Sequence, residues 1–160
     1  MERAKQISLF ITLILWGTLI GGVMYSHVVF FPAYLSHLPE STQLIKGPYA
    51  LHDENFWMSM HPVIILSFIV TILLNWKLPE RRKFILTAFG IYILAIIATF
   101  SFFVPELIAF AESSNSATTP ADWFQRGQTW QHMSWVRGFF MYVAFIMLLI
   151  ALTKNKIADR

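Results

Sequence analysis

Cysteine is absent from this chain of 160 residues, and charged residues make up only 13% of it. Without cysteine the chain forms no disulfides, no thiolate metal site and no thiol nucleophile. A soluble domain has roughly twice this share of charged residues, whereas 56% of the residues here are hydrophobic. The two shortages together argue against a soluble or disulfide-stabilised domain and favour a membrane protein.

The chain also lacks the motifs of several common enzymes and of nucleic-acid binders. It contains no phosphate-binding glycine loop, no HExxH zinc motif and no serine-hydrolase pattern. Its net charge of +3 is not arranged as a basic face interleaved with aromatic residues, so we expect no nucleic-acid partner. Most of the chain consists of segments rich in isoleucine, leucine, valine and phenylalanine, so we expect the functional residues to lie within these segments.

Four apolar stretches are long enough to cross a bilayer, which requires about 20 residues of helix. They cover residues 7–31, 56–76, 84–109 and 130–153. The first stretch is longer than the apolar part of a signal peptide and has no clear cleavage site after it, so we expect it to be retained as a helix. The sequence therefore predicts an all-α fold: one transmembrane domain over residues 1–160, an up-down-up-down bundle of four helices.

The basic residues predict how this bundle is oriented. With this threading, nine of them fall on one side, before the first stretch, between the second and third, and after the fourth: Arg3, Lys5, Lys77, Arg81, Arg82, Lys83, Lys154, Lys156 and Arg160. Cytoplasmic loops carry such an excess of lysine and arginine. We therefore expect both termini in the cytoplasm, with the protein in a membrane such as the bacterial inner membrane, and the two long loops on the external or periplasmic side.

Each apolar stretch carries one side chain able to bind a metal, near the external end in every case. These are His27, His61, Glu106 and His132. Ionisable groups at such depth are costly and usually functional, and imidazoles with a carboxylate suit Cu, Fe or Zn. The pattern predicts one shared site, with Glu106 as fourth ligand or proton-handling group. The alternative is that each histidine merely bonds a nearby carbonyl.

Arg137 is the other outlier, because an arginine within a membrane helix needs a partner. Glu106 is the expected partner; otherwise Arg137 binds an anionic group such as a haem propionate or a substrate oxygen. Both residues are therefore expected to take part in catalysis. Gly17 and Gly21 form a GxxxG spacing, which allows close helix contact. Packing within the bundle is the preferred interpretation, and a homo-oligomer through this face is the alternative.

Three segments resemble the anthrone-oxygenase-like family of small four-helix membrane proteins. They are GVMYSHVVFFPAYLSHLP, with Pro32; NFWMSMHP; and WQHMSWVRGFF, which resembles the family's start of the fourth helix, with Trp130, His132 and Arg137 in place. The resemblance extends over nearly the full length. It implies an oxidoreductase that acts on a small apolar aromatic substrate.

These observations predict a membrane redox protein with a metal site near the external face. The expected ligands are His27, His61, His132 and Glu106, with Arg137 as an anion clamp. The metal would activate oxygen or exchange electrons with a lipid-soluble partner such as quinone. Two alternatives remain. In a haem b protein, two of the histidines would be axial ligands and Arg137 would meet a propionate. In a non-catalytic subunit or lipid-binding module, these groups would be structural.

Overall fold

The computed structural model describes residues 2–154, except the side chain of Asn115, and every regular element in this range is helical. Lys156 and Arg160, which helped to predict the orientation, lie outside the described residues. Four helical rods make up most of the structure: α1 (Glu2–Tyr25), η1 (Ser26–Phe30) and α2 (Phe31–Leu35); α3 (Glu54–Asn75); α4 (Pro79–Ala98), η3 (Thr99–Phe103) and α5 (Val104–Ala111); and α6 (Pro120–Thr153). Short 3₁₀ helices lie in the loops: η2 (Glu40–Leu44) and η4 (Ser113–Asn115). The all-α prediction is confirmed.

All four rods are long and apolar enough to cross a membrane, as Glu2–Leu35, Glu54–Asn75, Pro79–Ala111 and Pro120–Thr153. Polar residues lengthen the first, third and fourth rods beyond the predicted apolar ranges. Pro79 and Pro120 lie in the first turns of α4 and α6, where a missing amide hydrogen costs nothing. The Thr119 hydroxyl caps α6 by accepting a hydrogen bond from the Asp122 amide at 3.3 Å. Capping therefore starts α6 about three turns before its apolar part.

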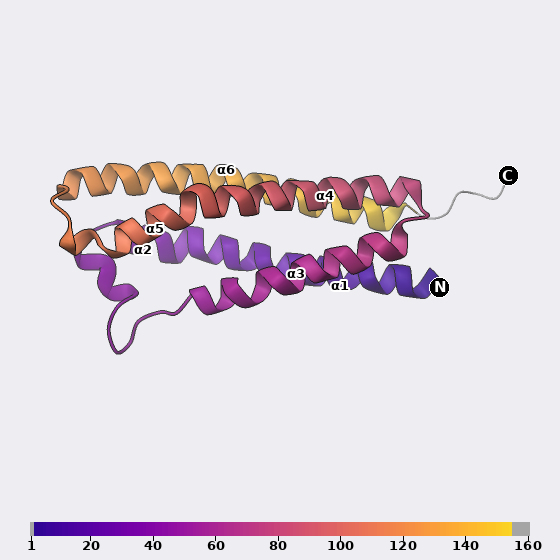
Figure 1. Ribbon diagram of the computed structural model, residues 1–160, viewed down its shortest axis with the longest axis horizontal. Helices are drawn as coiled ribbons and strands as arrows, with labels where there is room; N and C mark the ends of the chain where they lie inside the picture. The colour runs from indigo at the N-terminus through magenta and orange to yellow at the C-terminus, as the bar shows by residue number, and fades with distance from the viewer. Residues whose placement is uncertain (1, 155–160) are drawn as a thin grey trace.

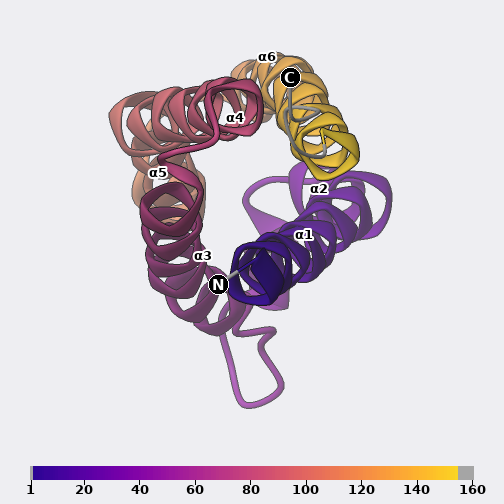
Figure 2. The same cartoon turned by 90° about the vertical axis from the view of Figure 1, so that its right-hand side faces the viewer.

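The rods lie side by side and form a four-sided ring, seen end-on in Figure 2. In this ring α1 contacts α3 and α6, and α4 contacts the same two helices. The start of α1, the end of α6 and the α3–α4 turn lie at one end, here called the terminal end (Figure 1). Hydrogen bonds join these elements there: Asn75 Nδ2 donates to the Lys5 carbonyl at 3.4 Å, and Arg81 Nε donates to the Lys154 carbonyl at 3.2 Å. The two long loops lie at the opposite end, the loop end.

The buried apolar side chains form two separate clusters. The terminal-end cluster includes Trp16, Phe68, Tyr92 and Leu148, and the loop-end cluster includes Phe31, Phe110, Trp123 and Trp130. Three rods pass from one cluster to the other, and each does so at a polar residue: His27 on the first, Thr99 on the third, and Ser134 with Arg137 on α6. We call these four residues the polar layer. They divide the apolar core in two.

Two rods change their helical winding at this layer. The segments η1 and η3 are π-helical, five residues each, and each is followed by a proline in the next α-helix, Pro32 and Pro105. Proline lacks an amide hydrogen and crowds the carbonyl four residues earlier, so it disturbs the preceding turn. Such π-helical insertions are frequent at functional sites. Here each contains a residue of the polar layer, His27 in η1 and Thr99 in η3.

The two glycines of the GxxxG motif are not used for contacts within the bundle. A Cβ atom added at Gly17 or Gly21 would meet nothing within 4 Å among the described residues. The preferred interpretation, packing within the bundle, is therefore wrong for this pair. Its neighbour Gly22 makes the close contact instead, because a Cβ atom there would lie 2.6 Å from Cε1 of Phe56 on α3. The homo-oligomer through Gly17 and Gly21 stays a prediction.

Candidate functional site

Arg137 is the cation of the polar layer, and its partners are hydroxyl groups and one aromatic ring. Nη1 donates to Thr99 Oγ1 at 2.7 Å, and Nη2 donates to Ser134 Oγ at 2.9 Å. The guanidinium carbon lies 3.9 Å from the ring centroid of Phe103, which is a cation–π contact. No carboxylate among residues 2–154 forms an ion pair with it. A guanidinium has five N–H donors, so several remain open to a further acceptor.

His27 is fully engaged by its own helix and by α6. Its side chain is 2% exposed. Nδ1 lies 2.7 Å from the Val23 carbonyl, and Nε2 lies 2.8 Å from Ser134 Oγ. A carbonyl only accepts, so Nδ1 carries the proton; in the neutral imidazole Nε2 then accepts from the Ser134 hydroxyl. Ser134 thus accepts from Arg137 and donates to His27, which leaves neither ring nitrogen of His27 available for a metal.

His61 lies on α3 and faces α4. Its Nδ1 is 2.6 Å from the hydroxyl of Tyr92, which is 1% exposed. The imidazole is half-buried, and the Trp57 ring stacks beside it with centroids 6.2 Å apart. The charge of Arg137 acts on both His61 and His27, so the two imidazoles share one electrostatic environment. Nε2 of His61 has no hydrogen-bond partner within the described range. Among the described histidines, His61 therefore has a ring nitrogen that is open to a further hydrogen bond.

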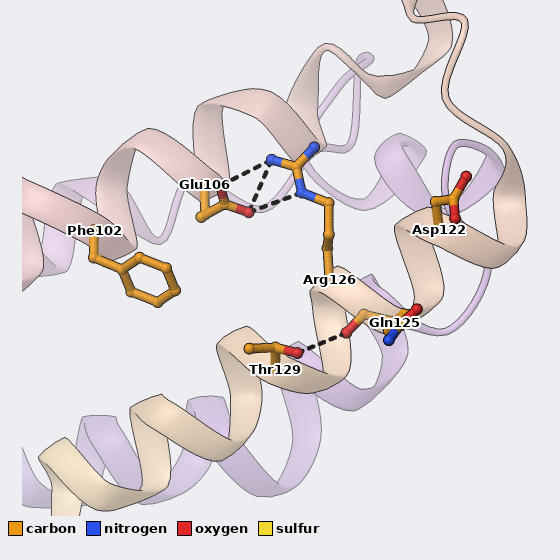
Figure 3. Close-up of a pocket in the computed structure, with 6 residues that line it drawn as sticks. All are labelled: Phe102, Glu106, Asp122, Gln125, Arg126 and Thr129. Carbon is orange, nitrogen blue, oxygen red and sulfur yellow. Dashed lines mark hydrogen bonds and ion pairs between the residues drawn. The ribbon is translucent and has the colours of Figure 1, made fainter.

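Glu106 pairs with Arg126, so the predicted Glu106–Arg137 pair is wrong. Figure 3 shows the Arg126 side chain reaching from α6 to Glu106 on α5. Arg126 Nη2 donates to Glu106 Oε1 at 2.8 Å and Oε2 at 2.9 Å, and Nε donates to Oε2 at 3.2 Å. Arg137 lies eleven residues further along α6, about 16 Å away along the axis. The ion pair therefore belongs to the loop end, outside the polar layer.

Beside this ion pair, the surface between α5 and α6 is hollowed into an open pocket of about 470 Å³. Six residues line it: Phe102, Glu106, Asp122, Gln125, Arg126 and Thr129 (Figure 3). The lining carries two carboxylates and one guanidinium. The Arg126 guanidinium also lies over the Trp123 ring, 4.5 Å from its centroid. The pocket is distinct from the polar layer, because the two share no residue.

His132 does not join the other predicted ligands. Its side chain is exposed on α6, and no hydrogen bond or ion pair to it is found in the described part of the chain. Ser134, two residues further on, is fully buried. The two positions differ because residues two apart point to nearly opposite sides of a helix. The sequence spacing predicted the position of His132 along the bundle axis, but it did not predict the side of α6 to which the imidazole points.

The described residues contain no group of three or more histidines, aspartates and glutamates that could hold a metal ion. The physical reason is that each predicted ligand has a different environment. Both ring nitrogens of His27 form hydrogen bonds, one with the Val23 carbonyl and one with the Ser134 hydroxyl. Both carboxylate oxygens of Glu106 accept hydrogen bonds from Arg126. The His132 side chain is exposed. Within the described range, only His61 keeps a ring nitrogen inside the bundle that has no hydrogen-bond partner. Ser134 therefore joins Arg137 and His27, whereas His61 is bonded to Tyr92 and is linked to Arg137 only through the charge of the guanidinium. Glu106 and His132 lie apart from these groups.

Sequence reasoning missed four residues that complete these sites: Thr99, Ser134, Tyr92 and Arg126. The hydroxyl residues gave little signal, because serine and threonine are common in membrane helices and often bond to their own backbone. Tyr92 offered a clearer one, since a tyrosine in the middle of an apolar helix needs a hydrogen-bond partner when it is buried. Arg126 lies before the predicted apolar stretch of residues 130–153, although it lies within α6.

Comparisons with known proteins give no relative for this chain. No family model matches the sequence, and no curated protein and no solved structure matches it either. The case for a function therefore depends on the geometry of the residues themselves.

Proposed function

We propose that this chain is an integral membrane protein that binds a small, lipid-soluble ligand carrying a phenol or carbonyl oxygen, such as a quinone, at Arg137. The single observation that carries this proposal is the environment of the guanidinium. Arg137 lies between two apolar clusters with hydroxyl partners and no described carboxylate partner. An arginine within a membrane helix is costly without a counter-ion. An electron-rich ligand oxygen would supply the acceptor that no carboxylate among residues 2–154 provides.

The neighbouring groups suit such a ligand. Phe103 covers one face of the guanidinium, so an oxygen would approach the N–H edge, where the hydrogen bonds form. Thr99 and Ser134 hold that edge in place through bonds of 2.7 and 2.9 Å. Hydrogen bonds from a charged donor are about twice as strong as neutral ones. The Arg137 side chain would therefore both bind the ligand and favour its ionised form.

His61 would receive the proton. In this step the ligand's phenolic O–H bond breaks, the proton passes to Nε2 of His61, and the electron pair stays on the oxygen beside Arg137. The His61 Nδ1–H then donates to the Tyr92 oxygen, 2.6 Å away. General bases of this type are most often histidines. Deprotonation makes a phenol easier to oxidise, and the proposal therefore falls within the predicted oxidoreductase class.

The proposal includes a placement in the membrane. The rods would thread up-down-up-down, with both termini in the cytoplasm and the two long loops outside, as the positive-inside bias predicts. The polar layer would then lie in the external half of a membrane such as the bacterial inner membrane. A ligand would reach it from the bilayer, not from the cytoplasm.

The metal and haem versions of this function stay predictions. Elemental analysis of the purified protein tests for Cu, Fe or Zn, and a Soret band in its absorption spectrum tests for haem b. Within the described range only His61 retains a free ring nitrogen near Arg137. A bound metal would therefore require His27 to release Ser134, and His27→Ala would reduce metal content only in that case.

An alkyl-substituted nitrophenol tests the proposed function, because its anion absorbs visible light and its neutral form does not. Added to the protein in detergent, slightly below the phenol's own pKa, it should bind as the anion and colour the sample. Arg137→Gln should weaken binding about tenfold or more, which is the loss expected for a hydrogen bond to a charged group. Arg82→Gln is the matched control, because Arg82 lies at the terminal end and bonds the Trp76 carbonyl.

Two results would contradict the proposal. In one, Arg137→Gln binds the probe as tightly as the wild type and shows the same anion absorbance. In the other, the wild type shows no anion absorbance at saturating probe. If His61→Gln retains binding but loses the shift toward the anion, the assignment of His61 as the proton acceptor is supported. The non-catalytic alternative predicts that none of these variants differs from Arg82→Gln.

A further inference from the structure

The pocket between α5 and α6 has a polarity gradient along the helix axis. Phe102 lies at the end of the pocket nearer the terminal end of the bundle, and Asp122 lies at the opposite end, toward the loops (Figure 3). Glu106 and Arg126 lie between them. One end of the pocket thus offers an apolar ring and the other a carboxylate. An amphiphile would lie here with its polar part toward the loop end.

The length of α6 places this pocket at the level of lipid headgroups. A helix of 34 residues is about 51 Å long, whereas the hydrocarbon core of a bilayer is about 30 Å thick. The excess of roughly 20 Å is divided between the two ends of α6. Asp122, Gln125 and Arg126 lie within the first seven residues of α6, in this excess. The pocket therefore faces the interface and not the hydrocarbon.

Two polar atoms of the pocket remain open, and they have opposite charge. Arg126 uses Nε and Nη2 for Glu106, and its Nη1 has no acceptor among residues 2–154. Asp122 Oδ2 accepts from the Thr119 hydroxyl at 2.7 Å, and its Oδ1 has no donor in the same range. The two residues are four apart on α6 and so lie on one face, about 6 Å apart.

We infer that this pocket binds the headgroup of a phospholipid with a primary ammonium, of the phosphatidylethanolamine type. The phosphate would accept from Nη1 of Arg126, and the ammonium would donate to Oδ1 of Asp122. An ethylene linker separates the two groups of this headgroup, which matches one helical turn. The acyl chains would run past Phe102 along the apolar surface of the rods. With two carboxylates and one guanidinium, the pocket is net negative and favours the ammonium over an anionic headgroup.

Native mass spectrometry of the full-length protein, delipidated in detergent, tests this inference. The protein is offered three lipids with identical acyl chains: phosphatidylethanolamine, phosphatidylcholine and phosphatidylglycerol. The choline headgroup has the same charge as ethanolamine and no N–H donor. We expect a single retained phosphatidylethanolamine per chain, with about tenfold preference over phosphatidylcholine, since the discriminating hydrogen bond joins two charged groups.

A change of preference gives the sharper result, because it does not depend on a loss of folding. Glu106→Gln frees the Arg126 charge and removes one negative charge from the pocket. This variant should therefore discriminate less against phosphatidylglycerol, with a smaller preference for phosphatidylethanolamine than the wild type has. Glu112→Gln is the matched control, because Glu112 is an exposed acid at the same end that does not line the pocket. It should retain the wild-type preference.

Asp122→Asn should lose the preference for ethanolamine over choline while it still binds both lipids. The inference is overturned if the wild type retains the three lipids equally, or if Glu106→Gln keeps the preference of Glu112→Gln. Binding of the nitrophenol probe to Arg137 is unaffected in all of these variants, so the failure of one proposal leaves the other standing.

Discussion

The Tyr92 hydroxyl lies 2.6 Å from Nδ1 of His61, so a buried phenol on α4 and a half-buried imidazole on α3 share one hydrogen bond. The rings are nearly parallel, with an angle of 26° between their planes and centroids 5.9 Å apart. Tyr92 also contacts the Trp16 ring edge-on at 4.8 Å. The contacts fix the phenol from two sides and hold the imidazole at a defined height in the bundle.

Tyr92→Phe should destabilise the protein by about 1–3 kcal/mol, because it keeps the ring and leaves Nδ1 of His61 without its partner. Denaturation in mixed micelles, followed by tryptophan fluorescence, measures the change. The effect should not add to that of His61→Ala: a double-mutant cycle should give a coupling of about 1 kcal/mol between the two residues. Additive effects would show that the hydrogen bond contributes nothing.

Ser134→Ala should cost about 1–3 kcal/mol as well, since it removes the hydroxyl between Arg137 and His27 and leaves both unpaired at that point. The same unfolding assay gives the value. Ser59→Ala is the control, because the Ser59 hydroxyl is exposed and bonds only to its own helix; its effect should stay within about 0.5 kcal/mol. Equal effects of the two substitutions would contradict the assigned role of Ser134.

Neighbouring glycines on α1 should respond oppositely to alanine. Gly22→Ala places a methyl group 2.6 Å from Phe56 Cε1, and the overpacking should cost about 1–3 kcal/mol. Gly21→Ala meets open space, so the higher helix propensity of alanine should leave the protein unchanged or stabilise it by up to about 1 kcal/mol. If Gly21→Ala is the more damaging change, the Gly17–Gly21 face has a partner outside this chain, and cross-linking of the purified protein identifies it.

Asp53, in the first long loop, makes the stability depend on pH. Burial raises the pKa of its carboxyl above the ordinary value, against the opposing effect of the hydrogen bond from Trp57 Nε1 at 3.1 Å. The folded protein thus holds this proton more tightly than the unfolded chain does. Its contribution to stability is present at low pH and is lost as pH rises from the unfolded pKa through the folded pKa.

Asp53→Asn should therefore flatten the pH dependence of unfolding in the acid range, because the amide oxygen still accepts from Trp57 and no longer ionises. Unfolding midpoints of the wild type and the variant should be measured from about pH 4 to about pH 7. The two midpoints should be similar at the acid end, and the variant should have the higher midpoint at neutral pH. Identical slopes for the wild type and the variant would mean that the Asp53 pKa is the same in both states.

Much of the fold could be predicted from the sequence, because length and apolar composition decide whether a segment is a membrane helix. The ends of the helices could not be predicted in the same way. The first ten residues of α6 include five polar ones, Asp122, Gln125, Arg126, Gln128 and Thr129, yet they are helical because Thr119 and Pro120 form a favourable start. Hydropathy locates the apolar middle of a helix, but it does not locate the polar capping residues at which the helix begins and ends.

The candidate site was predicted less well, for a geometric reason. A rise of about 1.5 Å per residue gives the height of a side chain, and the heights of His27, His61 and Arg137 were useful. The direction of a side chain depends on how the helix is rotated, and nothing in the spacing gives that rotation. His132 therefore faces outward, and Glu106 meets Arg126 instead of Arg137.

The polar layer separates two apolar bodies that share few side chains, so hydrophobic burial stabilises each body largely by itself. Cooperative unfolding spreads through continuous packing, and regions that lack it open independently. Hydrogen exchange should therefore resolve two units. The amides of α2 and α5, beyond the prolines, should exchange at a lower free energy than those of α1 and α4. A ligand oxygen on Arg137 would bridge the two units and bring their opening energies together.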